Sequence, residues 1–227
     1  MKQKLPRNYL VVLVLFTAFD LLALFIRNLY AQNNSYNFLL WNLFLAFVPL
    51  LLAWITYYIA NKWSKGGVLL FSFLWLLFYP NAPYMISDLI HVNDNSPIIL
   101  YESLLLFSYA MLALFYGFYS LKIIHLVFKF RMGKFLANVF IWVCIVLSSV
   151  GIYLGRILRL NSWDIFSHPV TALQTIFDHL FPIAKNPSAY LVIVLFSFIQ
   201  FILLIMMKDF DEVEGSHLIS DEVVITS

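Results

Sequence analysis

The sequence predicts an all-α, polytopic protein that crosses a membrane about six times. The first reason is composition: 63% of the 227 residues are hydrophobic and only 11% are charged, whereas soluble domains average roughly 25% charged residues. The second is that the charges are separated by apolar runs of about 20 residues, the length that crosses a hydrocarbon core about 30 Å thick. Backbone groups in lipid must be hydrogen-bonded within their own segment, so we expect these runs to be helices.

Six apolar runs follow one another along the chain. The predicted spans are approximately Tyr9–Ile26, Phe38–Ala60, Gly67–Ile90, Ile98–Ser120, Leu136–Leu158 and Ala189–Met207. Pro80 and Pro83 must break or kink the third span. The first span follows a basic start, as in a signal peptide, but it contains Asp20 and has no small-residue cleavage pattern, so we expect it to be retained. Residues 1–207 are therefore treated as one transmembrane helical domain.

The distribution of lysine and arginine predicts the orientation. If the N-terminus lies in the cytoplasm, the inside segments hold ten basic residues and the outside segments hold four. This excess on the inside predicts that both termini are cytoplasmic. Residues 208–227 are acidic and polar, which predicts a disordered cytoplasmic tail that either solubilises this end or binds a partner.

The outer connection between spans five and six has its own pattern. Apolar residues recur at steps of three and four, at Trp163, Phe166, Val170, Leu173, Phe177 and Leu180. Pro169 suits the first turn of a helix. The pattern predicts an amphipathic helix that lies in the outer interface or folds back over the bundle.

Several classes of function are disfavoured. The formal charge of +2 and the scattered basic residues argue against nucleic-acid binding. Cys144 is the single cysteine, so neither an intramolecular disulfide nor a cysteine metal site is expected. The chain has no Gly-rich phosphate loop, Walker motif or nucleophile elbow. Whether it binds a cofactor stays unknown.

Ionisable residues within spans cost about 2.5–3.5 kcal/mol at the bilayer centre and are candidates for function. Here most of them lie near the predicted outer ends. In Tyr79–Tyr84, two prolines bracket a short segment. The residue before each proline favours an extended conformation, so we expect freed carbonyls that are buried in protein or line a wet cavity. Asp88 and His91 follow, and their spacing of three places them on one face if the helix resumes.

Arg156 and Arg159 are likewise three residues apart, where the fifth span emerges. We hypothesise that they bind an anionic group such as phosphate or carboxylate in an outward-facing pocket. His91 would act as the general base, since its unperturbed pKa is about 6.5, with Asp88 orienting it. Further candidate ligand contacts are Asn81, Tyr84, Trp41, Asn42, Asn161, Trp163 and Asp164.

Structural interpretations stand beside this hypothesis. The two arginines also suit a position among lipid headgroups, Asp88 suits an ion pair with one of them, and Asp20 suits a structural contact with Arg27. A metal site would use Asp88 and His91 with candidates from the outer connection, His168, His179 and Asp164. No metal site is predicted, because short ligand spacings such as H-x-x-x-H are missing.

The chain resembles a family of bacterial multi-pass membrane proteins of unknown function, DUF1361. The resemblance is carried by the following segments: Phe38–Ala46, Tyr79–Tyr84 with Ser87–His91, Gly155–Arg156 and Asn161–Asp164. It covers roughly Arg27 to Met207 and implies a multi-pass protein of a bacterial inner or cytoplasmic membrane. It implies no substrate, reaction or cofactor.

Three classes of function follow, and whether the protein is an enzyme stays open. The first is binding or processing of an anionic lipid headgroup or envelope molecule, which requires Asp88, His91, Arg156 and Arg159 to converge on a cavity. The second is a structural or accessory membrane subunit, in which each charge is paired and no cavity lies between them. The third, a small-solute transporter, is disfavoured because the inner halves of the spans have almost no charge and no inverted repeat is visible.

Overall fold

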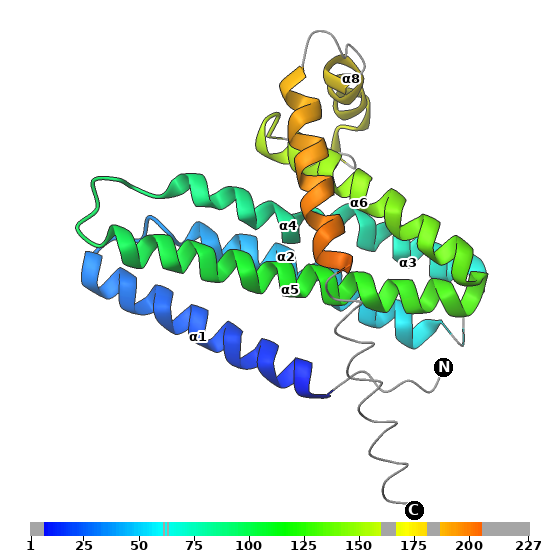
Figure 1. Cartoon of the computed structure of the whole chain (residues 1–227), viewed down its shortest axis with the longest axis horizontal. Coiled ribbons are helices and arrows are strands. Elements are labelled where there is room, and N and C mark those ends of the chain that lie inside the picture. Colours follow the sequence, from blue (N-terminus) through cyan, green and yellow to red (C-terminus); the bar gives the residue numbers. More distant parts are fainter. Residues whose placement is uncertain (1–6, 61, 63, 160–166, 181–186, 206–227) are drawn as a thin grey trace, which may run out of the picture.

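The computed structural model describes residues 7–60, 62, 64–159, 167–180 and 187–205 (Figure 1). The helices are α1 (Arg7–Ala31), α2 (Phe38–Ile59), α3 (Lys65–Phe78), α4 (Asn81–Tyr84), the 3₁₀ helix η1 (Met85–His91), α5 (Ile99–Met132), α6 (Lys134–Arg156) and α8 (Pro169–Leu180), followed by a last helix, Pro187–Ile205. The described residues form no strand. Six helical stretches are long and apolar enough to cross a membrane, which confirms the predicted all-α, multi-pass fold class.

The helix α5 is the centre of the bundle. It packs against α1, α2, α4, η1 and α6, and most of its apolar side chains are buried. It is 34 residues long, or about 50 Å at 1.5 Å per residue, and it continues past the predicted end near Ser120. Its last turns carry the charged residues Lys129 and Arg131. A helix that continues beyond the apolar run in this way is longer than hydropathy alone predicts.

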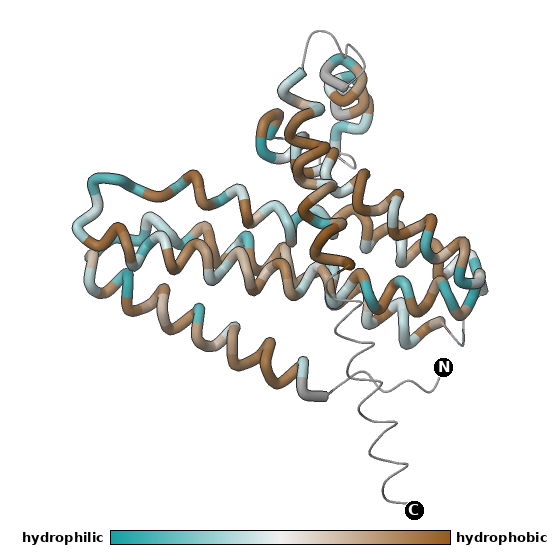
Figure 2. Tube along the Cα trace, viewed as in Figure 1, coloured by the Kyte–Doolittle hydropathy of each residue, from teal (hydrophilic) through white to brown (hydrophobic). Residues whose placement is uncertain are grey.

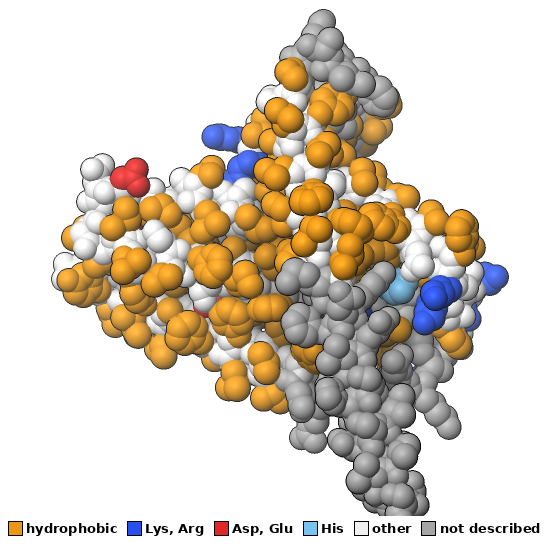
Figure 3. All heavy atoms as spheres, viewed as in Figure 1, with side chains coloured by type: hydrophobic (Ala, Val, Ile, Leu, Met, Phe, Trp, Pro, Cys, Tyr) orange, Lys and Arg blue, Asp and Glu red, His pale blue; other side chains and the backbone are white. Residues whose placement is uncertain are grey.

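The surface of the bundle is largely apolar. On α1, Val12, Val14 and Leu15 are exposed, and hydrophobic side chains cover most of the face shown in Figure 3. Hydrophilic residues gather instead at the connections at the two ends (Figure 2). Soluble monomers rarely expose apolar patches beyond a few hundred Å², so this surface fits contact with a lipid bilayer.

The proline-bracketed segment is helical, and the expected extended break is wrong. Tyr79, which precedes Pro80, has φ −54° and ψ −39°. Pro80 is the N-cap of the short helix α4, a position at which the missing N–H removes no helical bond. The Asn81 amide donates to the Phe78 carbonyl at 2.9 Å, and the Tyr84 N–H donates to the Pro80 carbonyl at 3.0 Å. Carbonyls of the segment are thus satisfied locally rather than by a wet cavity.

Two glycines allow this segment to lie close to its neighbours. A Cβ atom on Gly117 of α5 would lie 2.7 Å from Cβ of Ala82, and one on Gly151 of α6 would lie 2.8 Å from Cγ of Pro80. Real Cβ atoms essentially never approach other atoms so closely. The kinked segment is therefore clamped between α5 and α6, which positions the residues that follow it.

The helix α8 begins at Pro169, as predicted for the connection between spans five and six. Three of its apolar residues, Val170, Leu173 and Phe177, are exposed, as expected for a helix that lies in an interface. Trp163, Phe166 and the acidic tail lie outside the described residues. In Figure 1 the last helix crosses α5 and α6 steeply, and its Gln200 amide donates to Ser149 Oγ at 3.0 Å.

Candidate functional site

One group of polar residues forms where η1, α2 and α6 meet. Asp88 of η1, which is 1% exposed, makes an ion pair with Arg156, the last residue of α6. Its other oxygen accepts a hydrogen bond from the Asn42 amide of α2 at 2.8 Å. The alternative in which Asp88 pairs with one of the two arginines is confirmed. Together with Asn42, the pair joins three separate segments of the chain.

Arg156 is held by four residues of one short segment. Its Nε donates to Ser87 Oγ at 2.8 Å, one terminal nitrogen contacts Asp88, and the other lies 3.3 Å from His91 Nε2. The guanidinium carbon lies 4.3 Å from the centroid of the Tyr84 ring, a cation–π geometry. Within the described part of the chain, three of the five guanidinium N–H groups have partners, and the side chain is 17% exposed.

The geometry changes the role expected of Asp88. Its two oxygens contact Arg156 and Asn42, so it orients the arginine rather than His91. The His91 ring is held instead by Arg156 and, edge to face, by Phe38, with ring centroids 5.2 Å apart. The acid/base roles of Asp88 and His91 stay a prediction, and the expected dyad contact is replaced by contacts to Arg156.

Arg159 does not share a helical face with Arg156. The helix α6 ends at Arg156, and Arg159 is exposed with a left-handed φ of +56°. The chain therefore turns away from the helical path between them. The two arginines lie at the same end of α6, but their spacing of three residues no longer means that their side chains point in the same direction.

The other predicted ligand contacts are placed differently. Tyr84 and Asn42 contact the Asp88–Arg156 pair, as described above, whereas Asn81 caps the Phe78 carbonyl. Trp41 is 55% exposed and packs against Phe44, with ring centroids 5.6 Å apart. Ligand binding by these four residues stays a prediction. Asn161, Trp163 and Asp164 lie outside the described residues.

A second ion pair joins α1 to α5. Arg27 and Glu102 are 3% and 1% exposed, and Nε and one terminal nitrogen of Arg27 donate to Glu102 Oε1 at 2.9 and 2.5 Å. The other three N–H groups of Arg27 are also engaged, by the Asn33 carbonyl at 3.0 Å, Asn33 Oδ1 at 2.5 Å and Ser35 Oγ at 3.0 Å. Arg27 therefore has no N–H group left for a ligand.

The expected contact between Asp20 and Arg27 is wrong. The Asp20 carboxylate accepts from Ser108 Oγ at 2.6 Å, and the Asp20 carbonyl accepts from the Tyr109 hydroxyl at 3.1 Å. Seven residues of helix separate Asp20 from Arg27 by about 10 Å, and Arg27 extends toward the connection after α1 rather than back along the helix.

Tyr36 links this second pair to the segment of His91. Its ring lies 4.5 Å below the Arg27 guanidinium, and its hydroxyl lies 3.1 Å from the His91 carbonyl and 3.3 Å from Glu102 Oε2. Burial, and then the charge of Glu102, raises the pKa of Tyr36 above its ordinary value. The phenol therefore stays protonated at neutral pH, and its single proton is donated to the His91 carbonyl or to Glu102 Oε2.

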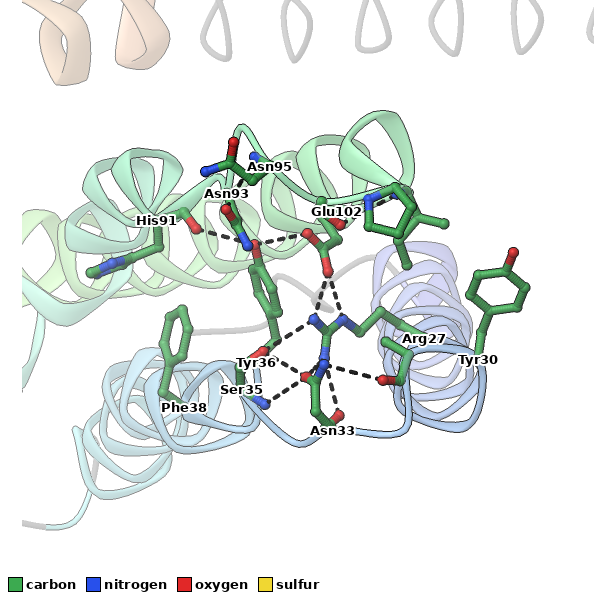
Figure 4. A pocket seen from close by; sticks show the side chains of 14 residues that line it. Arg27, Tyr30, Asn33, Ser35, Tyr36, Phe38, His91, Asn93, Asn95 and Glu102 are labelled. Carbon is green, nitrogen blue, oxygen red and sulfur yellow. Dashed lines mark hydrogen bonds and ion pairs between the residues drawn. The ribbon is translucent and has the colours of Figure 1, made fainter.

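A cavity of about 510 Å³ lies beside the Arg27–Glu102 pair (Figure 4). Its lining residues are Arg27, Tyr30, Ala31, Asn33, Ser35, Tyr36, Phe38, His91, Asn93, Asn95, Ser96, Pro97, Ile98 and Glu102. The sequence prediction missed Tyr36 and the three asparagines. The available signal was that two short asparagine-rich connections, residues 32–37 and 92–98, fall on the same predicted side of the membrane.

A comparison with protein families identifies the chain. The model described as "Protein of unknown function (DUF1361)" matches residues 41–203. The chain belongs to the DUF1361 family. The match confirms the resemblance over a range that is narrower than predicted, and Arg27 and Tyr36 precede it. No curated protein and no solved structure matches the chain. Because the family description names no activity, the function of this DUF1361 protein must be argued from its geometry.

Proposed function

We propose that this DUF1361 protein binds an anionic group, of a lipid headgroup or another envelope molecule, at the Arg156 end of α6. The observation that carries the proposal is the difference between the two paired arginines, Arg27, which is buried, and Arg156, which is half-buried. All five N–H groups of Arg27 have protein partners, whereas two of those of Arg156 have none within the described part of the chain. A guanidinium with two N–H groups available suits bidentate contact with phosphate or carboxylate.

In this proposal Arg159 supplies the net positive charge of the site. The charge of Arg156 is balanced by Asp88, and the C-terminus of α6 carries a partial negative charge of its own. An anion at this position therefore requires a second cation, and Arg159, exposed three residues beyond Arg156, provides it. In this proposal both termini lie in the cytoplasm of a bacterial cell, as the lysine and arginine distribution predicts, and the site faces outward.

The test is native mass spectrometry of the full-length protein in mild detergent with added phosphatidylglycerol. We expect Arg159→Ala, which alters an exposed side chain, and Arg156→Lys, which keeps the charge but removes the planar fork, to retain less of this lipid. Lys134→Ala is the matched control, because Lys134 is exposed at the opposite end of the same helix. Equal retention by the parent, both variants and the control would reject the proposal.

A structural role is the second candidate, and a specific observation favours it. The buried carboxylates Asp88 and Glu102 are each matched by an arginine, and each pair joins helices that are distant in the sequence. Such pairs fix how helices meet without any ligand. This role predicts that Arg159→Ala changes neither lipid retention nor stability, whereas the anion-binding proposal requires a loss of retained lipid.

A further inference from the structure

We propose that the cavity beside Arg27 and Glu102 binds a neutral, hydroxyl-rich group such as a sugar ring. This inference goes beyond the anion site and does not depend on it, because neither Arg156 nor Arg159 lines the cavity. The volume of about 510 Å³ falls within the range of roughly 300–1,000 Å³ that is usual for ligand pockets. The walls come from the end of α1, the two asparagine-rich connections and the start of α5.

The charges in the wall argue against an ionic ligand. Arg27 and Glu102 neutralise each other, and Arg27 has no N–H group left to bind an anion. A metal cation is not favoured either, because the described residues contain no group of three His, Cys, Asp or Glu side chains with suitable spacing. A bound cation would also place a second positive charge beside Arg27.

One acceptor in the wall is still available. The two hydrogen bonds that Arg27 donates to Glu102 both go to Oε1. Among the described residues, Oε2 accepts only the 3.3 Å contact from Tyr36. A carboxylate oxygen offers more than one acceptor site. Oε2 can therefore accept a hydrogen bond from a ligand hydroxyl while the ion pair stays intact, so Glu102 can hold a neutral donor.

The rest of the wall is composed of groups that suit hydroxyls. Asn93 and Asn95 lie on the Glu102 side of the pair, and Asn33 lies on the Arg27 side (Figure 4). Each amide side chain both donates and accepts, as each hydroxyl of a sugar does. Tyr30 also lines the cavity and is 72% exposed, so its ring is available to pack against the C–H face of a sugar.

The test measures binding to the full-length protein in detergent. Calorimetry measures the binding of three free probes: glucose, N-acetylglucosamine and myo-inositol. Native mass spectrometry compares the binding of a lipid probe, monoglucosyl diacylglycerol, with that of diacylglycerol. Asn95→Ala should weaken binding roughly twofold to tenfold, the effect of one hydrogen bond. Asn34→Ala is the matched control, since it is exposed in the facing connection but is not among the lining residues.

Each outcome has a defined meaning. Binding of a free sugar that Asn95→Ala weakens supports the proposal with a soluble ligand, and binding of the glucosyl lipid alone supports it with a headgroup. If no probe binds, or if Asn95→Ala and Tyr30→Leu both bind like the parent, the proposal is overturned. Arg159→Ala should leave sugar binding unchanged, and Asn95→Ala should leave phosphatidylglycerol retention unchanged, so failure of one site is distinguishable from failure of the other.

Discussion

The buried pair of Arg27 and Glu102 should contribute strongly to stability, and this contribution can be measured. Removing one member of a buried ion pair typically costs about 3–5 kcal/mol, because the other charge is left without compensation. Glu102→Leu leaves the arginine with its bonds to Asn33 and Ser35. Arg27→Met leaves the carboxylate with Tyr36 as its described partner. We therefore expect both variants to fall in this range, with Arg27→Met nearer its upper end.

The double variant Arg27→Met/Glu102→Leu completes the cycle. Apolar side chains of similar volume often replace a buried pair at little cost, so the double variant should cost less than the sum of the single variants by at least about 3 kcal/mol. Unfolding in SDS micelles, followed by circular dichroism, gives the free energies. Two results would refute the reasoning: single costs below about 1 kcal/mol, as for exposed pairs, or costs that add without coupling.

Two further predictions concern the packing and the hydrogen bonds around the site. Gly117→Ala and Gly151→Ala should each destabilise the protein by about 1–3 kcal/mol through overpacking against Ala82 and Pro80, whereas Gly66→Ala should be nearly neutral because its Cβ would meet only Ser64 Oγ at 3.7 Å; equal melting temperatures for all three would contradict the clamp. Tyr36→Phe should cost about 1 kcal/mol in the same SDS titration, because the hydroxyl donates to the His91 carbonyl or Glu102, and Tyr58→Phe, on an exposed ring, is the control.

Most of the fold was predictable because hydropathy reports the free energy of placing a segment in lipid. All six spans were located from this property, and those predicted ends that fall on described residues differ from the structure by a few residues, except at α1 and α5. These helices continue beyond their apolar runs, to Ala31 and Met132, where hydropathy carries no information. The proline segment was misjudged for a different reason: the steric bias against helix before proline is weak enough to be overcome by close packing against Gly117 and Gly151.

The candidate site was predictable only where the free-energy cost of a charged side chain in the membrane favours an oppositely charged partner. A carboxylate within a span is costly to leave unpaired, so an ion pair between Asp88 and an arginine stood among the alternatives, beside the acid/base role. No pattern in the sequence joins Arg27 to Glu102, which is 75 residues away, and Asp20 was the nearer carboxylate. The spacing of three residues also wrongly placed Arg159 on the same helical face as Arg156, because no sequence signal marked the end of α6 at Arg156.

The contrast between the two arginines separates a structural from a binding role. If both pairs served only to hold helices together, each arginine would be expected to have its donors engaged by protein, as Arg27 has. Arg156 is instead fixed in direction by Tyr84, Ser87 and Asp88 while described residues leave two of its N–H groups without a partner. The short helix η1 assists this, because side chains three residues apart in a 3₁₀ helix eclipse each other, which brings Asp88 and His91 to the same arginine. A guanidinium that is held in one direction and still has two N–H groups to donate suits the anion site that we propose, and for this reason anion binding is the function to test first.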